Sequence, residues 1–374
     1  MQPARKTEQK TVNPLRALQQ YGQSVWLDYI RRDLLTSGEL KRLIEKDGLR
    51  GMTSNPTIFD KAIGGSAEYD SALRAAVRAE PSLSTKALFE RVAIEDIRVA
   101  ADALRLVYDS SGGADGFVSF EVSPDLAYDK DTTIAEAQRL FKTIGKPNVM
   151  IKVPATPQGV FAVETLIAEG ININATLMFS LGHYEAVAQA YLRGLRRNGR
   201  PGQIASVASF FVSRVDTLVD GKLEAVGTPE ALALRGKIGV ANCKIVYQRF
   251  RELFRGANFA EFAKRGARVQ RPLWASTGTK NKAYSDVLYV EELIGPDTVN
   301  TLPPATLDAF RDHGQPRASL ESGVEEAREA LASLRKLNID LDAITETLQT
   351  QGVAAFAESY EQLLRTLEKK RSAL

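Results

Sequence analysis

The sequence predicts a single α/β domain, a (β/α)8 barrel of the TIM type with one extra helix before it and further helices after it. Short apolar runs alternate with longer stretches of helical periodicity along most of the chain, the pattern of repeated strand–helix units. There are eight such runs, the number that closes a barrel. Nearly every run ends in a polar side chain, where barrels carry their functional residues. A doubly wound open sheet is the alternative, but no Gly-x-Gly-x-x-Gly turn or Walker loop follows any run.

The predicted strands are short and rich in apolar and β-branched residues. They cover residues 24–28, 49–54, 116–122, 148–153, 171–177, 204–211, 271–276 and 297–302. Most of the intervening helices begin at a Thr, Ser or Pro start signal, and they are predicted over residues 85–108, 132–144, 160–169, 181–197 and 229–255. A leading helix is predicted at 14–21, and two closing helices at 320–337 and 341–367.

These elements organise residues 1–374 as one domain. A polar tail over 1–13 precedes a barrel core over 24–312, and C-terminal helices over 319–367 cover the outside or one end of the barrel. The tail has no apolar core, so it is read as neither a signal peptide nor an anchor. The last residues, 368–374, are polar enough to fray.

Composition excludes several classes of protein. The 49 Lys and Arg against 46 Asp and Glu leave a net charge of +3, which is too small to indicate a nucleic-acid footprint, although a small anionic substrate fits. No stretch reaches membrane-spanning length. The single cysteine, Cys243, permits no disulfide within the chain, which favours a cytoplasmic location. His183 and His313 stand far apart without acidic or cysteine clusters, so no metal site is expected.

Lys152 is the most informative residue, because it lies inside the apolar run over 149–154. Removing an ammonium from water disfavours its charged form, and a neutral lysine is an amine nucleophile that forms Schiff bases with carbonyl substrates. The alternative is a lysine that extends to solvent at a strand end or pairs with a carboxylate. Neighbouring motifs have to decide between these interpretations.

Polar side chains at the ends of the other predicted strands support a shared pocket, since a barrel brings all of these ends to one face. A single acid at a strand end could be a helix cap or an ion-pair partner, but a whole set is hard to explain that way. The set comprises Asp28, Thr53, Asn55, Glu121, Lys152, Asn174, Thr176, Ser209, Arg214 and Ser276.

Four segments resemble the motifs of transaldolases, and they cover residues 51–59, 149–156, 171–180 and 206–216. The resemblance implies a class I aldolase barrel of the non-oxidative pentose phosphate pathway. Such an enzyme moves a dihydroxyacetone unit from sedoheptulose 7-phosphate or fructose 6-phosphate to glyceraldehyde 3-phosphate or erythrose 4-phosphate. Its partners are therefore small sugar phosphates, and the sequence leaves open whether the protein is a monomer or a homodimer.

The same resemblance implies roles for four catalytic residues. Lys152 would form the Schiff base with the C2 carbonyl, and Asp28 would take the proton of the C4 hydroxyl as the C3–C4 bond breaks. Glu121 would move protons through a water held by Thr176 during formation of the Schiff base. The iminium would serve as electron sink, so no metal or other cofactor is expected.

Further residues are expected to bind the substrate. Asn55 and Asn174 would hold hydroxyls, since an amide both donates and accepts, and Arg214 is the best phosphate ligand. Where short transaldolases carry a second arginine, this chain reads Ala-Ser-Thr-Gly-Thr-Lys, so the second phosphate cation would be Lys280. The full set of expected binding residues is Thr53, Asn55, Asn174, Ser209, Phe211, Arg214, Ser276 and Lys280.

Two other functions compete with transfer. A fructose-6-phosphate aldolase-like lyase of the same superfamily would release dihydroxyacetone to solvent. That group has a tyrosine at the position of Phe211 and a glutamine at that of Glu121, so both residues favour the transferase. A barrel that only binds sugar phosphates would need no nucleophile, which the presence of Lys152, Asp28 and Glu121 argues against.

Overall fold

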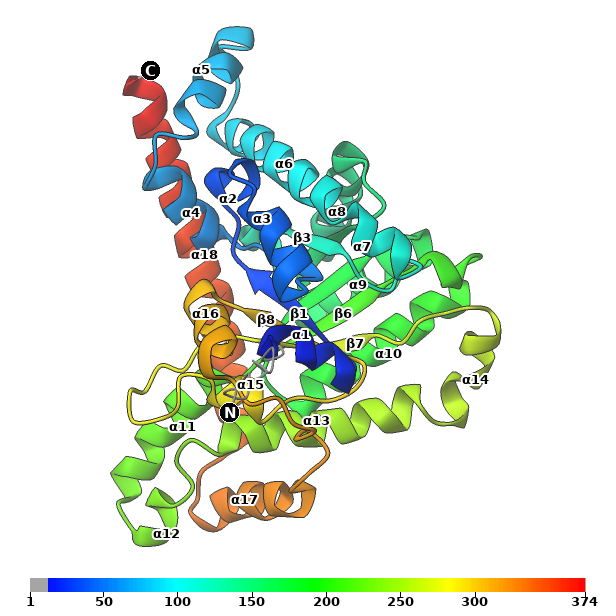
Figure 1. Cartoon of the computed structure of the whole chain (residues 1–374), viewed down its shortest axis with the longest axis vertical. Helices are drawn as coiled ribbons and strands as arrows, with labels where there is room; N and C mark the ends of the chain where they lie inside the picture. Colours follow the sequence, from blue (N-terminus) through cyan, green and yellow to red (C-terminus); the bar gives the residue numbers. More distant parts are fainter. Residues whose placement is uncertain (1–12, 374) are drawn as a thin grey trace, which may run out of the picture.

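In a computed structural model, which describes residues 13–373, eight parallel strands form one closed barrel (Figure 1). Each strand pairs with the next along the chain, and the last pairs with the first. The strands are β1 (Gln23–Asp28), β2 (Gly51–Thr53), β3 (Phe117–Glu121), β4 (Val149–Pro154), β5 (Ile173–Met178), β6 (Ser206–Phe211), β7 (Arg271–Ala275) and β8 (Thr298–Leu302). Each overlaps one predicted run, and the predicted (β/α)8 fold class is confirmed.

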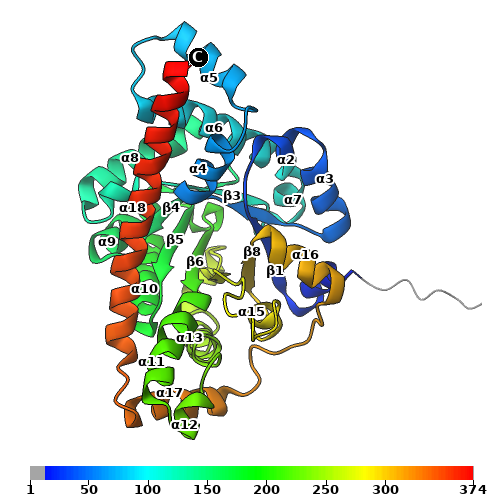
Figure 2. The same ribbon diagram turned by 90° about the vertical axis from the view of Figure 1, so that its left-hand side faces the viewer.

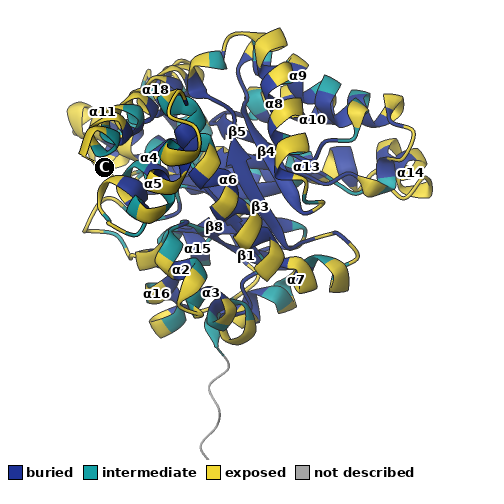
Figure 3. Cartoon of the chain, turned by 90° about the horizontal axis from the view of Figure 1, so that it is seen from above, coloured by how far each residue is buried: buried dark blue, intermediate teal, exposed yellow. Residues whose placement is uncertain are grey.

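Helices surround the barrel, with apolar faces turned inward and polar faces exposed (Figure 3). Those up to the fourth strand are α1 (Pro14–Ala17), α2 (Arg32–Thr36), α3 (Glu39–Arg42), α4 (Pro56–Gly64), α5 (Asp70–Ala79), α6 (Thr85–Ala103), α7 (Arg105–Ser110) and α8 (Lys130–Ile144). The later ones are α9 (Pro157–Glu169), α10 (Leu181–Arg197), α11 (Ser213–Val226), α12 (Pro229–Leu232), α13 (Ile238–Phe254), α14 (Ala257–Lys264), α15 (Leu288–Glu291), α16 (Pro304–His313), α17 (Val324–Lys336) and α18 (Leu341–Ala373).

Two predicted helices are each broken in the structure. The helix predicted at 229–255 forms α12 and α13, because Gly236 between them has a φ of 71° and lies against the ring of Tyr284, where a Cβ atom would come within 2.9 Å. The helix predicted at 85–108 forms α6 and α7, which are separated at the fully buried Leu104, whose φ is −87° and ψ is 0°. The leading helix is α1 followed by a 3-10 turn over Leu18–Tyr21.

The segment between β2 and α6 contains two helices that were not predicted, α4 and α5. The start of α4 carries a recognisable signal, since Asn55 accepts a hydrogen bond from the backbone N–H of Ile58 at 3.0 Å and Pro56 occupies the first helical position. Asn13, placed in the predicted tail, caps α1 in the same way through Leu15. The rest of that tail, 1–12, lies outside the described residues.

The last helix, α18, is longer than predicted and its end does not fray within the described residues. It continues to Ala373 because its final turns are tied to the barrel's helical coat: the Lys370 ammonium lies 2.8 Å from Asp70, and the Arg371 guanidinium donates to the carbonyl oxygen of Leu83. Figure 2 shows α18 running along nearly the whole length of the molecule, packed on α4, α6 and α11 and reaching β5. None of the helices in residues 13–373 has an apolar stretch long enough to cross a membrane.

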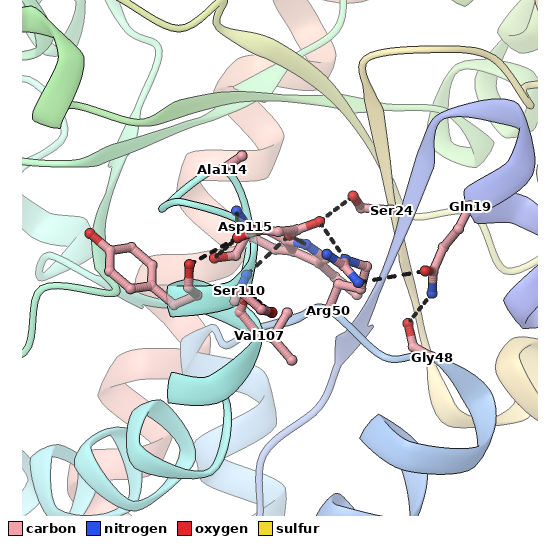
Figure 4. Close-up of polar contacts among 12 residues, drawn as sticks. Gln19, Ser24, Gly48, Arg50, Val107, Ser110, Ala114 and Asp115 are labelled. Atoms are coloured by element: carbon pink, nitrogen blue, oxygen red, sulfur yellow. Dashed lines mark hydrogen bonds and ion pairs between the residues drawn. The ribbon is translucent and has the colours of Figure 1, made fainter.

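The N-terminal end of the barrel is closed by a polar network centred on Asp115, just before β3 (Figure 4). This buried carboxylate accepts hydrogen bonds from Ser24 and from the indole N–H of Trp26, both on β1. Arg50, before β2, and Arg271, on β7, lie 3.2 and 3.4 Å from it. The network therefore links segments of four strands at the end opposite Asp28 and Lys152.

Candidate active site

A cavity of about 140 Å³ opens at the C-terminal ends of the strands. Every residue predicted for the site lines this cavity except Asn174, which is fully buried, and Glu121, which is paired with the cavity residue Lys152. The lining consists of Asp28, Thr53, Asn55, Lys152, Thr176, Ser209, Phe211, Arg214, Ala275, Ser276, Gly278, Lys280, Thr301, Pro303 and Phe356. Side chains from separate strands and from the distant helix α18 thus meet at one point.

Lys152 lies on β4 at the floor of the cavity, with only 4% of its surface exposed. Its register partner on β3 is Glu121, and the Lys152 Nζ atom lies 3.0 Å from Glu121 Oε2. The same nitrogen donates to the carbonyl oxygen of Ser54 at 3.3 Å. The ion pair that one interpretation of this lysine required is therefore present. Because the side chain also lines the cavity, the pair adjoins space that a substrate could enter.

Burial raises the pKa of Glu121, and the charge of Lys152 opposes that rise. Only one of the two carboxylate oxygens is paired: Glu121 Oε1 is buried without a hydrogen-bond partner in the described part of the chain. The hydroxyl of Thr176, on β5, is buried and unpaired in the same sense. Buried polar atoms are almost always paired, so these two unpaired atoms are unusual, and one of them belongs to the carboxylate that contacts Lys152.

Asp28 ends β1 on another side of the cavity and has different surroundings from Glu121. The hydroxyl of Thr53 donates to Asp28 Oδ1 at 2.7 Å, and Thr53 also contacts the hydroxyl of Thr301 at 2.7 Å. Burial raises the pKa of Asp28, while the charge of Lys152, the Thr53 hydrogen bond and the charge of Lys280 all lower it. The site thus contains two carboxyl groups, only one of which is paired directly with the lysine.

Positive charge gathers on the side of the cavity formed by α11 and by the loop after β7. The Arg214 guanidinium lies 5.3 Å from the centre of the Phe211 ring, and burial lowers its pKa. No carboxylate within residues 13–373 forms an ion pair with it, so its donors are available to an anion. Ser276 has a φ of 56°, unusual for a residue with a Cβ atom, and its hydroxyl lies 2.9 Å from that of Ser213. Lys280 is exposed at the rim of this side.

The two asparagines differ in how much of their hydrogen-bonding capacity the protein uses. Asn174 is fully buried on β5: it accepts from the Ser209 hydroxyl at 2.6 Å and donates to the Ser119 hydroxyl at 3.1 Å. Its amide therefore retains one hydrogen, directed by a rigid network. Asn55 uses its oxygen to cap α4, which leaves its amide nitrogen free to donate.

Several residues of the site were not predicted. Thr301 follows from the same rule that found the others, since it lies near the end of the eighth strand, whose polar residues received no role. Gly278 and the Ser54 carbonyl have no side-chain signal. Phe356 comes from α18, and only the tertiary structure brings it to the cavity.

Within residues 13–373 there is no group of three or more His, Cys, Asp or Glu side chains that could hold a metal ion. Cys243 is fully buried, and burial raises the pKa of its thiol well above the ordinary value, so a thiolate nucleophile is disfavoured. Asp129 accepts from the backbone N–H of Thr132 and caps α8.

The family profile and the individual relatives that match this chain agree with one another. The sequence profile of the transaldolase/fructose-6-phosphate aldolase family matches residues 25–367. A protein named Transaldolase 2 from Nostoc sp. strain PCC 7120 is 46% identical over 96% of this chain and 98% of its own length. A transaldolase from Thiobacillus denitrificans is 48% identical, covering 94% of this chain and 99% of its own. A transaldolase from Mycobacterium marinum is 45% identical, covering 97% of this chain and 98% of its own length.

Proposed function

Because the chain belongs to the transaldolase/fructose-6-phosphate aldolase family, we propose that it transfers a dihydroxyacetone unit between sugar phosphates through a Schiff base on Lys152. It is an enzyme of the transferase class, as its relatives' name implies. The donor is sedoheptulose 7-phosphate or fructose 6-phosphate, and the acceptor is glyceraldehyde 3-phosphate or erythrose 4-phosphate. These substrates place it in the non-oxidative pentose phosphate pathway. The observation that supports this proposal most strongly is a buried lysine, 3.0 Å from a carboxylate, at the floor of a cavity that also holds Arg214, which has no ion-pair partner within residues 13–373.

The first step joins the donor to the enzyme. The neutral Nζ atom of Lys152 attacks the C2 carbonyl to give a carbinolamine, and loss of water then gives the iminium. Formation of the carbinolamine and loss of water both require proton transfers close to Lys152 Nζ. Glu121 accepts the lysine proton across their 3.0 Å contact and returns one to the departing hydroxyl through a water that also bonds Thr176. The unpaired Glu121 Oε1 and Thr176 Oγ1 atoms support this route.

The second step breaks the carbon chain. Asp28 takes the proton of the C4 hydroxyl, the C3–C4 bond breaks, and its electrons move into the iminium to form an enamine. An aldehyde leaves, the acceptor aldehyde enters, and the steps run in reverse. The Thr53 hydrogen bond and the nearby positive charges favour the ionised Asp28 that a base requires, against the burial that disfavours it.

Substrate binding follows from the charge distribution of the cavity. We assign the phosphate to Arg214, with Ser276 and Lys280 adding donors on the same side, since guanidinium matches phosphate oxygens with several donors. Asn55, Asn174 and Ser209 bind the hydroxyls of the three-carbon unit. No residue of the described cavity is needed as a metal ligand in this scheme, because the iminium accepts the electrons.

We also propose that the barrel over 24–312 and the helices over 319–367 act as one domain, since α18 contributes Phe356 to the cavity. A cytoplasmic location is proposed as well, because the single cysteine allows no disulfide within the chain.

The main alternative is a fructose-6-phosphate aldolase-like lyase, which uses the same Schiff base but releases dihydroxyacetone. Phe211 argues against the lyase. Its ring packs 5.2 Å from that of Phe179 and lies beneath Arg214, so the position itself carries an apolar ring without the tyrosine hydroxyl that could hold a water. An enamine in such surroundings persists until an aldehyde arrives.

The experiment that tests the proposal supplies fructose 6-phosphate as donor, with and without erythrose 4-phosphate as acceptor. Transfer predicts rapid formation of sedoheptulose 7-phosphate only when the acceptor is present, with little free dihydroxyacetone. Dihydroxyacetone release at the same rate without acceptor would establish the lyase instead. Lys152→Arg, which retains the charge but not a neutral amine, is expected to lack both activities.

A further inference from the structure

The helix α18 crosses the open end of the barrel and is held there by specific contacts (Figure 2). The Gln349 amide donates to the carbonyl oxygens of Ala155 and Leu177, at 3.0 Å each, at the C-terminal ends of β4 and β5. Leu177 has a φ of 61° within a bulge of β5, a conformation that side chains rarely adopt. Helix α18 therefore contacts β5 at the point where the backbone of β5 is distorted.

The same face of α18 approaches the site closely. Gly352, three residues after Gln349, has no Cβ atom; one placed there would lie 3.0 Å from the Leu177 side chain and 3.6 Å from the Arg214 guanidinium. Phe356 follows at the next turn on this face. The contacts at Gln349 and Gly352 therefore fix how far Phe356 reaches over the cavity.

Phe356 faces the reacting nitrogen of the proposed mechanism. Its side chain is buried, lines the cavity, and has its ring centre 5.3 Å from Lys152 Nζ. This distance is within the range of a cation–π contact. The iminium formed on Lys152 would carry a positive charge at the same nitrogen, so the contact can persist through the covalent intermediate.

We infer that Phe356 is a positioning residue that covers the Schiff base and keeps water away from the enamine, so that the three-carbon unit is transferred rather than released. This inference rests on the proposed function. The competing reaction begins when the enamine carbon C3 takes a proton from water. Water then adds to the iminium at C2, and the C–N bond breaks to give dihydroxyacetone and the free lysine amine. A ring over Lys152 hinders both steps by excluding water, and its contact with the charged nitrogen opposes the second step by stabilising the iminium against addition of water.

The test compares Phe356→Leu and Phe356→Ala with the wild type and with Leu363→Ala. Leu363 is a fully buried residue of the same helix that does not line the cavity, so its truncation loosens α18 without uncovering Lys152. The measured quantity is the rate of dihydroxyacetone release without acceptor, divided by the rate of transfer to erythrose 4-phosphate. We expect both Phe356 variants to raise this ratio roughly tenfold, as loss of a desolvated cation–π contact would. Leu363→Ala is expected to leave it unchanged.

An unchanged ratio in Phe356 variants that still transfer would overturn the inference, and so would an equal rise in Leu363→Ala, because the effect would then come from loosening of the helix. Phe356→Leu nearly preserves volume, so it carries the test if the alanine variant does not fold. Failure of the proposed function looks different: the wild type itself would then show no transfer.

Discussion

At the scale of single residues, the two carboxyl groups of the site differ in the side chains that contact them. Glu121 contacts the lysine directly, whereas Asp28 is held by the Thr53 hydroxyl. Burial raises the pKa of both, and Lys152 is the largest opposing influence on each. Separate surroundings allow separate tasks, one at the nitrogen and one at the C4 hydroxyl. The proposed mechanism requires this separation.

Asp216, two residues after Arg214, gives a prediction about stability and pH. It accepts from the backbone N–H of Gly239 at 2.6 Å and from the Tyr289 hydroxyl at 2.8 Å, and burial raises its pKa to about 6. Because the folded state holds this proton more tightly than the unfolded chain does, the contribution of Asp216 to stability is fully present below the ordinary value of 3.8 and is lost as the pH rises through about 6.

The measurement is urea unfolding of the wild type and Asp216→Asn across that range. The free energy of unfolding of the wild type should fall relative to the variant by about 3 kcal/mol between the two pKa values, since each pH unit is worth about 1.4 kcal/mol. A difference between the two proteins that does not vary with pH would show that Asp216 titrates as it does in the unfolded chain.

At the scale of elements, the sequence predicts best what depends on local pattern. Each strand matches an apolar run, and most of the polar residues predicted at strand ends line one cavity because a barrel brings those ends together. Breaks depend on tertiary packing instead: Gly236 interrupts a helical pattern where it meets Tyr284. Phe356 could not be predicted for the same reason, since nothing in the local pattern of α18 indicates that it crosses the barrel. The end of α18, predicted to fray, is held by distant partners such as Asp70.

The loop after β7 carries a prediction about phosphate binding. Lys280 lines the cavity, while Lys282 on the same loop is exposed and does not. Lys280→Ala should raise the KM for fructose 6-phosphate roughly tenfold, the loss expected for one charge-assisted hydrogen bond. Lys282→Ala is the matched control and should behave as the wild type.

Unphosphorylated fructose provides the second comparison. If Lys280 binds phosphate, its removal should leave the slow reaction of this sugar unaffected. Equal KM values for the two lysine variants with fructose 6-phosphate would remove Lys280 from the site.

At the scale of the whole molecule, the Asp115 network and the proposed active site lie at opposite ends of the barrel. The Asp115 network closes the N-terminal end (Figure 4), and the cavity opens at the other end. In barrels of this kind the C-terminal face carries the chemistry. Changes at Asp115 should therefore affect folding and not turnover.

Asp115→Asn tests this division, because it leaves the Arg50 and Arg271 guanidinium groups without their shared carboxylate. The expected loss is about 3 kcal/mol in the free energy of unfolding, measured in urea, with kcat unchanged under native conditions. Asp109→Asn, which breaks an exposed pair with Arg105, is the control and should leave the free energy of unfolding nearly unchanged. Loss of turnover in a folded Asp115→Asn protein would contradict the separation.

In the proposed mechanism Lys152 forms a Schiff base with a ketone substrate, and reduction with borohydride in the presence of fructose 6-phosphate would trap this intermediate. We expect one reduced three-carbon adduct per chain, found by mass spectrometry on the peptide that spans residue 152 and absent from Lys152→Arg. An unmodified peptide in protein that still transfers, or an adduct on a different lysine, would contradict this mechanism.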